Sequence, residues 1–91
     1  MSMSNVFIAF QVNEESRPVV EAIMADNPNA VAVESPGMVK IDAPGHLTIK
    51  RQSIEDRTGA RFDLQQIHIN LITLSGHIDE DDDQFTLSWK H

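Results

Sequence analysis

The sequence contains no cysteine, only four glycines and few basic residues. Without cysteine the chain has no disulfide framework, no zinc ribbon and no thiol nucleophile, and nothing points to an oxidising compartment. No apolar run approaches the roughly 20 residues that span a bilayer, and residues 1–4 start no signal-type hydrophobic segment. We therefore expect a cytoplasmic protein that is neither secreted nor embedded in a membrane.

The scarcity of glycine argues against nucleotide binding. Glycine stands at positions 37, 45, 59 and 76, from which neither a dinucleotide fingerprint nor a phosphate-binding P-loop can be drawn. No pattern marks a nucleophile activated by an oriented base. No glutamate is followed three residues later by histidine, the pair that diiron sites in helical bundles use. The sequence therefore predicts no catalytic residue, metal site or cofactor in this chain.

Positive charge is also scarce. Seven Lys and Arg residues stand against 14 Asp and Glu residues, which gives a formal net charge of −7. Affinity for nucleic acid or for an anionic membrane comes largely from neutralising negative charge with Lys and Arg. We therefore expect neither as a partner and favour a basic or neutral protein surface.

The length and the remaining composition are those of one small globular domain. The chain has 91 residues, of which 41% are hydrophobic and 23% are charged. This balance is ordinary for a folded protein and supplies a thin but sufficient core. We expect a single domain over residues 1–91, with residues 1–4 as a flexible N-terminus.

The first half of the chain has clear periodic patterns. Apolar residues alternate over residues 5–12, which predicts a strand. A helix is predicted over residues 16–26, with Ser16 or Asn13 as its cap and Asn27-Pro28 as its stop. Three short strands follow, separated by two Pro-Gly pairs that suit type II turns. These strands are predicted at residues 30–34, 38–42 and 46–51.

The second half is less regular. Ser53 and Asp56 resemble a capping box and Gly59 a left-handed helix end, so a short helix is predicted over residues 53–59. Asp63 gives a second cap signal before a strand at 67–74 whose first turn is ambiguous. A loop at 76–83 and a final strand at 85–90 complete the chain. The class is α+β, with two β-α-β-β-like halves and short helices on an antiparallel or mixed sheet.

Three further features carry more than one interpretation. One face of the predicted strand over 67–75 is apolar, with Ile67, Ile69 and Leu71, and the other face is half apolar. Such a strand is either buried on both sides or half covered by another protein. Trp89 is interpreted as a core anchor, and the four histidines as polar residues of the surface or of strand faces. The acidic run 79–83 is contiguous and lacks glycine, unlike a calcium loop. It is either a solvated connector or an element of electrostatic recognition.

Several segments, taken in order, resemble one protein family along nearly the whole chain. They are Val20-Glu21-Ala22-Ile23, Asp26-Asn27-Pro28, Met38-Val39-Lys40, Ala43-Pro44-Gly45, Ile49-Lys50-Arg51, Asn70-Leu71-Ile72-Thr73-Leu74-Ser75-Gly76 and the acidic run from Asp79 to Asp83. Together they are similar to the regulatory, or coupling, components of bacterial multicomponent diiron monooxygenases, and most like the phenol hydroxylase branch.

The resemblance implies a small, cofactor-free, non-catalytic α+β protein. Such a protein binds a large hydroxylase that carries the diiron centre and receives electrons from an NADH-dependent reductase. It would change substrate and oxygen access and tie electron use to aromatic hydroxylation. A stand-alone domain that binds a small ligand is the alternative, and a small hydrolase or metal-dependent enzyme also stays open.

The family's hydroxylase-contacting segment matches Asn70, Ile72, Thr73 and Leu74 in this sequence. We expect these residues on the outer face of the strand over 67–75, where they would supply the central contact. Lys50 and Arg51 would be charged residues at its rim. The methane-oxidising branch has a smaller, hydroxyl-rich segment here, which suits a polar gate for substrate, whereas this sequence has Ile72 and Leu74. That branch also has a long N-terminal tail, so we assign to this protein neither the polar gate nor the functions of the tail.

Overall fold

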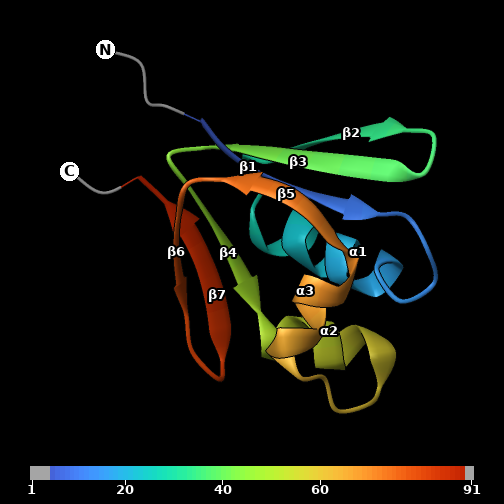
Figure 1. Ribbon diagram of the computed structural model, residues 1–91. Helices are drawn as coiled ribbons and strands as arrows, with labels where there is room; N and C mark the ends of the chain where they lie inside the picture. Colours follow the sequence, from blue (N-terminus) through green and yellow to red (C-terminus); the bar gives the residue numbers. More distant parts are fainter. Residues whose placement is uncertain (1–4, 90–91) are drawn as a thin grey trace.

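The computed structural model describes residues 5–89 as two antiparallel sheets with helices packed between and beneath them (Figure 1). The larger sheet has the strand order β2-β3-β1-β5, and the smaller has the order β4-β7-β6. The strands are β1 (Asn5–Gln11), β2 (Val31–Ser35), β3 (Met38–Pro44), β4 (His46–Lys50), β5 (Leu71–Ser75), β6 (His77–Glu80) and β7 (Gln84–Ser88). The helices are α1 (Arg17–Asp26), α2 (Arg51–Thr58), the 3₁₀ helix η1 (Leu64–Gln66) and α3 (Ile67–Asn70).

The core lies under one face of the larger sheet. Alternate residues of β1 and β3 are buried there, and α1 packs Val19, Ala22 and Ile23 into the same core. The paired strands β4 and β7 close it with four buried side chains, namely Leu47, Ile49, Phe85 and Leu87. Figure 1 shows the helices on this side of the larger sheet and none on its other face. The α+β class is thus confirmed, with every strand pair antiparallel.

The expected duplication of topology is present, although its members differ from those predicted. In the first half, β1, α1, β2 and β3 give the strand order β2-β3-β1. In the second half, β4, α2, β6 and β7 give the equivalent order β6-β7-β4. Strand β5 leaves its own half and pairs with β1, so it is an addition to the repeated unit.

The prediction of a strand from residue 67 onward was wrong for its first four residues, which form α3. The Asp63 cap signal explains this difference. Its carboxylate accepts a hydrogen bond from the N–H of Gln65 at 2.9 Å, and its carbonyl oxygen accepts one from Gln66 at 2.8 Å. These bonds start η1, which leads directly into α3. Leu64 of η1 and Ile67 of α3, three residues apart, are both buried. Capping and burial therefore override the strand preference of the β-branched residues.

Half of the segment 76–83, predicted as a loop, forms strand β6. Ile78 pairs with Leu87, and Asp79 lies opposite Thr86 on the outward face of the smaller sheet. Charged residues are tolerated here because β6 is an edge strand with every residue exposed. Only residues 81–83 remain as the connecting turn.

Two smaller predictions also need correction. Helix α2 begins at Arg51 without a side-chain cap, so Ser53 and Asp56 form no capping box, whereas Gly59 ends the helix at φ +71° as predicted. Trp89 is 41% exposed and donates its indole N–H to the carbonyl oxygen of Asn5 at 3.0 Å. It therefore joins the two ends of the described chain instead of anchoring the core.

Two predictions concern residues outside the described range. The expected flexible segment 1–4 and the end of the last predicted strand, with His91, lie beyond residues 5–89. Within that range, no helix combines the length and the apolar character needed to cross a membrane.

Candidate functional site

Strand β5 forms one edge of the larger sheet and carries the segment that the sequence singled out. Leu74 pairs with Ile8 and Thr73 with Ala9, but the next residue of β1, Phe10, pairs with Leu71. Ile72 is therefore an extra residue on β5, which is the arrangement of a β-bulge. A bulge at a sheet edge redirects the local side chains, and Ile72 is 46% exposed as a result.

The bulge separates the predicted contact residues into two groups. Ile72 and Thr73 are exposed, whereas Leu74 packs against the core together with Leu71. The expectation of Leu74 on the outer face was therefore wrong. The cause is its position opposite Ile8, because directly paired residues share one face of a sheet.

Helix α3 supplies the remaining part of this edge. Asn70 is its last residue, and its side-chain oxygen accepts a hydrogen bond from Nδ2 of Asn13 at 2.8 Å. Ile69 was assigned by alternation to the same face as Ile67, but it is 69% exposed while Ile67 is buried. Helical spacing explains the difference, since residues two apart point in different directions on a helix. The structure thus adds Ile69 to the exposed apolar residues beside β5.

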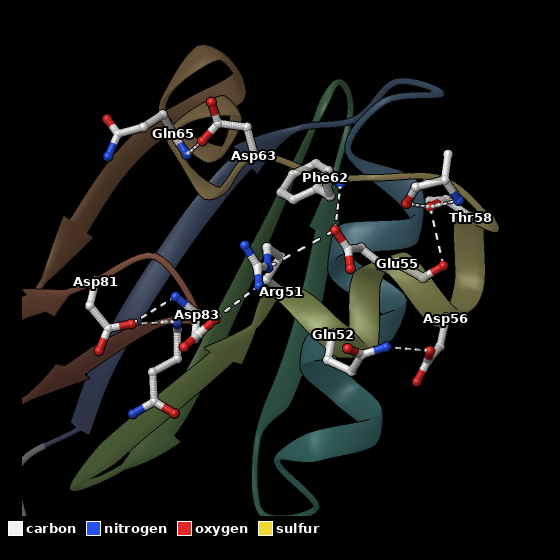
Figure 2. Close-up of polar contacts among 12 residues, drawn as sticks. Arg51, Gln52, Glu55, Asp56, Thr58, Phe62, Asp63, Gln65, Asp81 and Asp83 are labelled. Atoms are coloured by element: carbon white, nitrogen blue, oxygen red, sulfur yellow. Dashed lines mark hydrogen bonds and ion pairs between the residues drawn. The ribbon is translucent and has the colours of Figure 1, made fainter.

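Lys50 and Arg51 lie away from this edge, where β4 ends and α2 begins. Arg51 is held by acidic partners, as Figure 2 shows. Its guanidinium donates to Oδ1 of Asp83 at 2.9 Å and lies 4.0 Å from Oε2 of Glu55, and its backbone N–H donates to the carbonyl oxygen of Asp83. Arg51 therefore ties the start of α2 to the turn between β6 and β7.

An open cavity of about 700 Å³ lies beside Arg51, between α2 and residues 61–66. Two of its charged lining residues pair with each other, since Arg51 lies 4.0 Å from Oε2 of Glu55. The same oxygen accepts a hydrogen bond from the N–H of Phe62 at 2.9 Å (Figure 2). Small-molecule sites are usually concave and apolar with a few convergent polar groups. This open, polar surface gives no specific support to the small-ligand alternative.

The uncovered face of the larger sheet adjoins the β5 edge. Val31 and Val33 of β2 are exposed on it, and the ammonium group of Lys40 lies 4.4 Å from the centroid of the Phe7 ring. Thr73 shares this face, because it pairs with Ala9 beside Lys40. The outer face of the smaller sheet is polar by contrast, with threonines at positions 48 and 86.

Of the histidines, His68 has the most defined contacts. Its Nε2 lies 3.2 Å from Oε2 of Glu80, and its ring packs edge-on against Phe85 with centroids 6.0 Å apart. These contacts join α3 to β6. In the part of the chain from Asn5 to Trp89, no group of three or more His, Asp or Glu residues is arranged to hold a metal ion.

The acidic run begins in β6, and its last three residues, 81–83, form an ordered turn instead of an open connector. Oδ1 of Asp81 accepts hydrogen bonds from the N–H groups of Asp83, at 2.8 Å (Figure 2), and of Gln84, at 2.9 Å. The backbone N–H of Asp81 donates to the carbonyl oxygen of Gln84. The bonds from Gln84 and Asp83 lower the pKa of the Asp81 carboxyl below its ordinary value of 3.8, and slight desolvation opposes them. Because the folded-state pKa is lowered, this contribution to stability is present above pH 3.8 and is lost as pH falls through the lowered pKa.

We predict that the Asp81 carboxyl titrates below 3.8 when it is followed by NMR. An Asp81→Asn variant keeps an acceptor oxygen for the same two N–H groups, so its turn should stay closed without the acid titration. An Asp81→Ala variant should instead speed hydrogen exchange at Asp83 and Gln84. Equal exchange rates in the two variants would contradict the role of the side-chain oxygen.

The comparisons with known proteins agree along almost the whole chain. Residues 4–88 match the MmoB/DmpM family model. The stimulatory component DmpM of phenol 2-monooxygenase from Pseudomonas sp. (strain CF600) is 47% identical over 88 residues, which cover 97% of this chain and 98% of DmpM. A chain in a solved phenol hydroxylase–regulatory protein complex superposes with a TM-score of 0.92 at 44% identity, over 96% of this chain and all of that one.

A more distant structure shares the fold alone. Regulatory protein B of soluble methane monooxygenase gives a TM-score of 0.74 at 17% identity, over 94% of this chain and 65% of that protein. The family match and the near-complete coverage of DmpM are the findings that decide the assignment. The chain belongs to the MmoB/DmpM family.

Proposed function

We propose that this protein is the stimulatory component of a multicomponent phenol hydroxylase, which it regulates without catalysing a reaction itself. The observation that carries the proposal is the near-full-length similarity to the stimulatory component DmpM. The likeness to a chain from a phenol hydroxylase–regulatory protein complex supports the hydroxylase as the partner. The partner hydroxylase would hold the diiron centre and receive electrons from an NADH-dependent reductase, and the assembly would work in the cytoplasm.

The mechanism that we propose is a shift between states of the hydroxylase. A bound protein shifts such an equilibrium only by binding one state more tightly than the other, and coupling free energies are typically about 1 to 3 kcal/mol. The favoured state would admit the aromatic substrate and oxygen in a sequence that links electron use to hydroxylation. This role needs a specific surface and no reactive side chain.

We place the central contact on four residues at the β5 edge, here called the contact segment: Ile69, Asn70, Ile72 and Thr73. Two exposed isoleucines and two polar side chains lie together in the sequence around the end of α3 and the bulge. Exposed apolar side chains rimmed by polar groups are typical of protein interfaces. Lys50 and Arg51 remain proposed charged residues at the rim of the contact. Because Arg51 is paired with Asp83, a hydroxylase that contacts Arg51 would contact Asp83 as well.

The proposal is tested by adding the purified protein to a matched hydroxylase and reductase and measuring hydroxylated product per NADH consumed. We expect a saturable rise in this ratio and in the hydroxylation rate, because the coupling energy given above shifts the equilibrium between hydroxylase states by about 5- to 150-fold. The control is the same mixture without this protein. An unchanged ratio in the presence of folded protein would contradict the proposal, as would turnover of phenol by the isolated chain.

A further inference from the structure

A hydrogen bond between two asparagines joins parts of the chain that are 57 residues apart in the sequence. Asn13 lies in the turn between β1 and α1, and Asn70 ends α3 at the contact segment. Nδ2 of Asn13 donates to Oδ1 of Asn70 at 2.8 Å, and both residues are half-buried. The turn before α1 therefore touches the residue at which α3 passes into β5.

Ser16 determines which way the Asn13 amide faces. The backbone N–H of Ser16 donates to Oδ1 of Asn13 at 2.9 Å, and a backbone N–H cannot accept a hydrogen bond. Oδ1 must therefore face Ser16, and Nδ2 must face Asn70. Ser16 is itself fixed, since it is 2% exposed and its Oγ donates to the Gln11 carbonyl at 2.6 Å and accepts from the N–H of Asn13 at 3.1 Å.

The orientation of Asn13 in turn determines the orientation of Asn70. Because Asn13 offers a donor, Asn70 turns its side-chain oxygen inward and its NH₂ group the other way. Within residues 5–89 this NH₂ group has no hydrogen-bond partner, and it is not a buried unpaired group. It is therefore available to an acceptor on another molecule.

We propose that Asn13 is a positioning residue that makes Asn70 present its amide N–H, instead of its oxygen, to an acceptor on the hydroxylase. The inference rests on the proposed function, because the acceptor belongs to the partner. Backbone carbonyls and carboxylates are the acceptors that an amide NH₂ group recognises. Asn13 is expected to act only through Asn70 and to make no contact of its own.

An Asn13→Asp variant tests this orientation. One carboxylate oxygen still accepts from Ser16, but the other is also an acceptor, so Asn70 must rotate its amide and turn its oxygen outward. We expect the thermal unfolding midpoint to stay close to that of the unmodified protein. The concentration that gives half-maximal stimulation should rise about tenfold, the effect of one lost hydrogen bond. If Asn13 only supported the fold, this variant would stimulate normally, and that result would overturn the proposal.

An Asn70→Asp variant replaces the outward NH₂ group of residue 70 with an oxygen and leaves Asn13 unchanged. Its carboxylate still accepts from Nδ2 of Asn13 and presents an oxygen to the partner, so the same loss of about tenfold is expected. This variant keeps the test decisive if Asn13→Asp does not fold. Normal stimulation by Asn70→Asp would also overturn the proposal.

A double-mutant comparison excludes a simple effect of the added negative charge. Asn13→Asp placed in an Asn70→Ala background should cause no further loss, because the group it reorients is absent. A further loss of about tenfold in that background would overturn the proposal. If the unmodified protein gives no stimulation, the proposed function itself fails. If it stimulates and Asn13→Asp does so equally, only the role of Asn13 fails.

Discussion

An Ile72→Asp variant is expected to need about 30-fold more protein, or more, for half-maximal stimulation of the hydroxylase. Ile72 is the extra residue of the β5 bulge and is one of the exposed isoleucines of the contact segment. A carboxylate at the centre of an apolar contact must lose its water without gaining a partner. Such central residues typically contribute about 2 kcal/mol or more to binding, which corresponds to about 30-fold in affinity.

Val33→Asp is the matched control for Ile72→Asp. Val33 is 52% exposed and lies on β2, at the opposite edge of the same sheet, where it pairs with Lys40. An aspartate at position 33 adds the same charge to the same sheet, but beside Lys40 and away from the contact segment. The protein concentration for half-maximal stimulation should therefore change by less than about threefold. Circular dichroism should show both variants folded. Equal losses in the two variants would mean that the contact covers the whole outer face of the larger sheet instead of the β5 edge.

Gly76→Ala is expected to cause a large loss of folding stability, although it adds only one methyl group. Gly76 joins β5 to β6 at φ +141°, a conformation that L-residues rarely adopt. A Cβ atom there would lie 2.9 Å from Cγ of Leu87 and 3.1 Å from Cγ1 of Val6, and both side chains are fully buried. Backbone strain and overpacking together should cost about 2 to 4 kcal/mol, which lowers the unfolding midpoint by about 10 °C or more.

Gly37→Ala separates the two causes of this loss. Gly37 also has a positive φ, +77°, but a Cβ atom there would meet nothing within 4 Å. Its substitution should therefore cost only the backbone term of about 1 kcal/mol. Urea or thermal unfolding of both variants measures the difference. Equal losses would show that the close approach of Gly76 to Leu87 and Val6 contributes nothing.

The elements that could be predicted from the sequence are those whose signals are local. The alternation over residues 5–12 and the Asn27-Pro28 stop predicted β1 and the end of α1 closely. The failures came where local signals conflict. The β-branched residues at 67–70 read as a strand, but a cap at Asp63 and the burial of Ile67 made them helical. The acidic run read as a loop because strand pairing with β7 leaves no mark on its composition.

The same distinction applies to the candidate site. The resemblance to a family located the segment 70–74, but it could not tell which of these side chains face outward. That depends on the bulge at Ile72, which exposes Ile72, while Leu74 keeps its inward position opposite Ile8. The importance of Asn13 could not be predicted at all, since its bond to Asn70 spans 57 residues and follows no sequence period.

The sequence by itself determined the α+β class, the order of most elements and the membership of a family, because each follows from short-range patterns or from ordered similarity along the chain. Only the tertiary structure decided the faces of β5, the exposure of Ile69 and the direction of the Asn70 amide. These features result from strand register and from hydrogen bonds between distant residues. Such contacts exist only once the chain has folded.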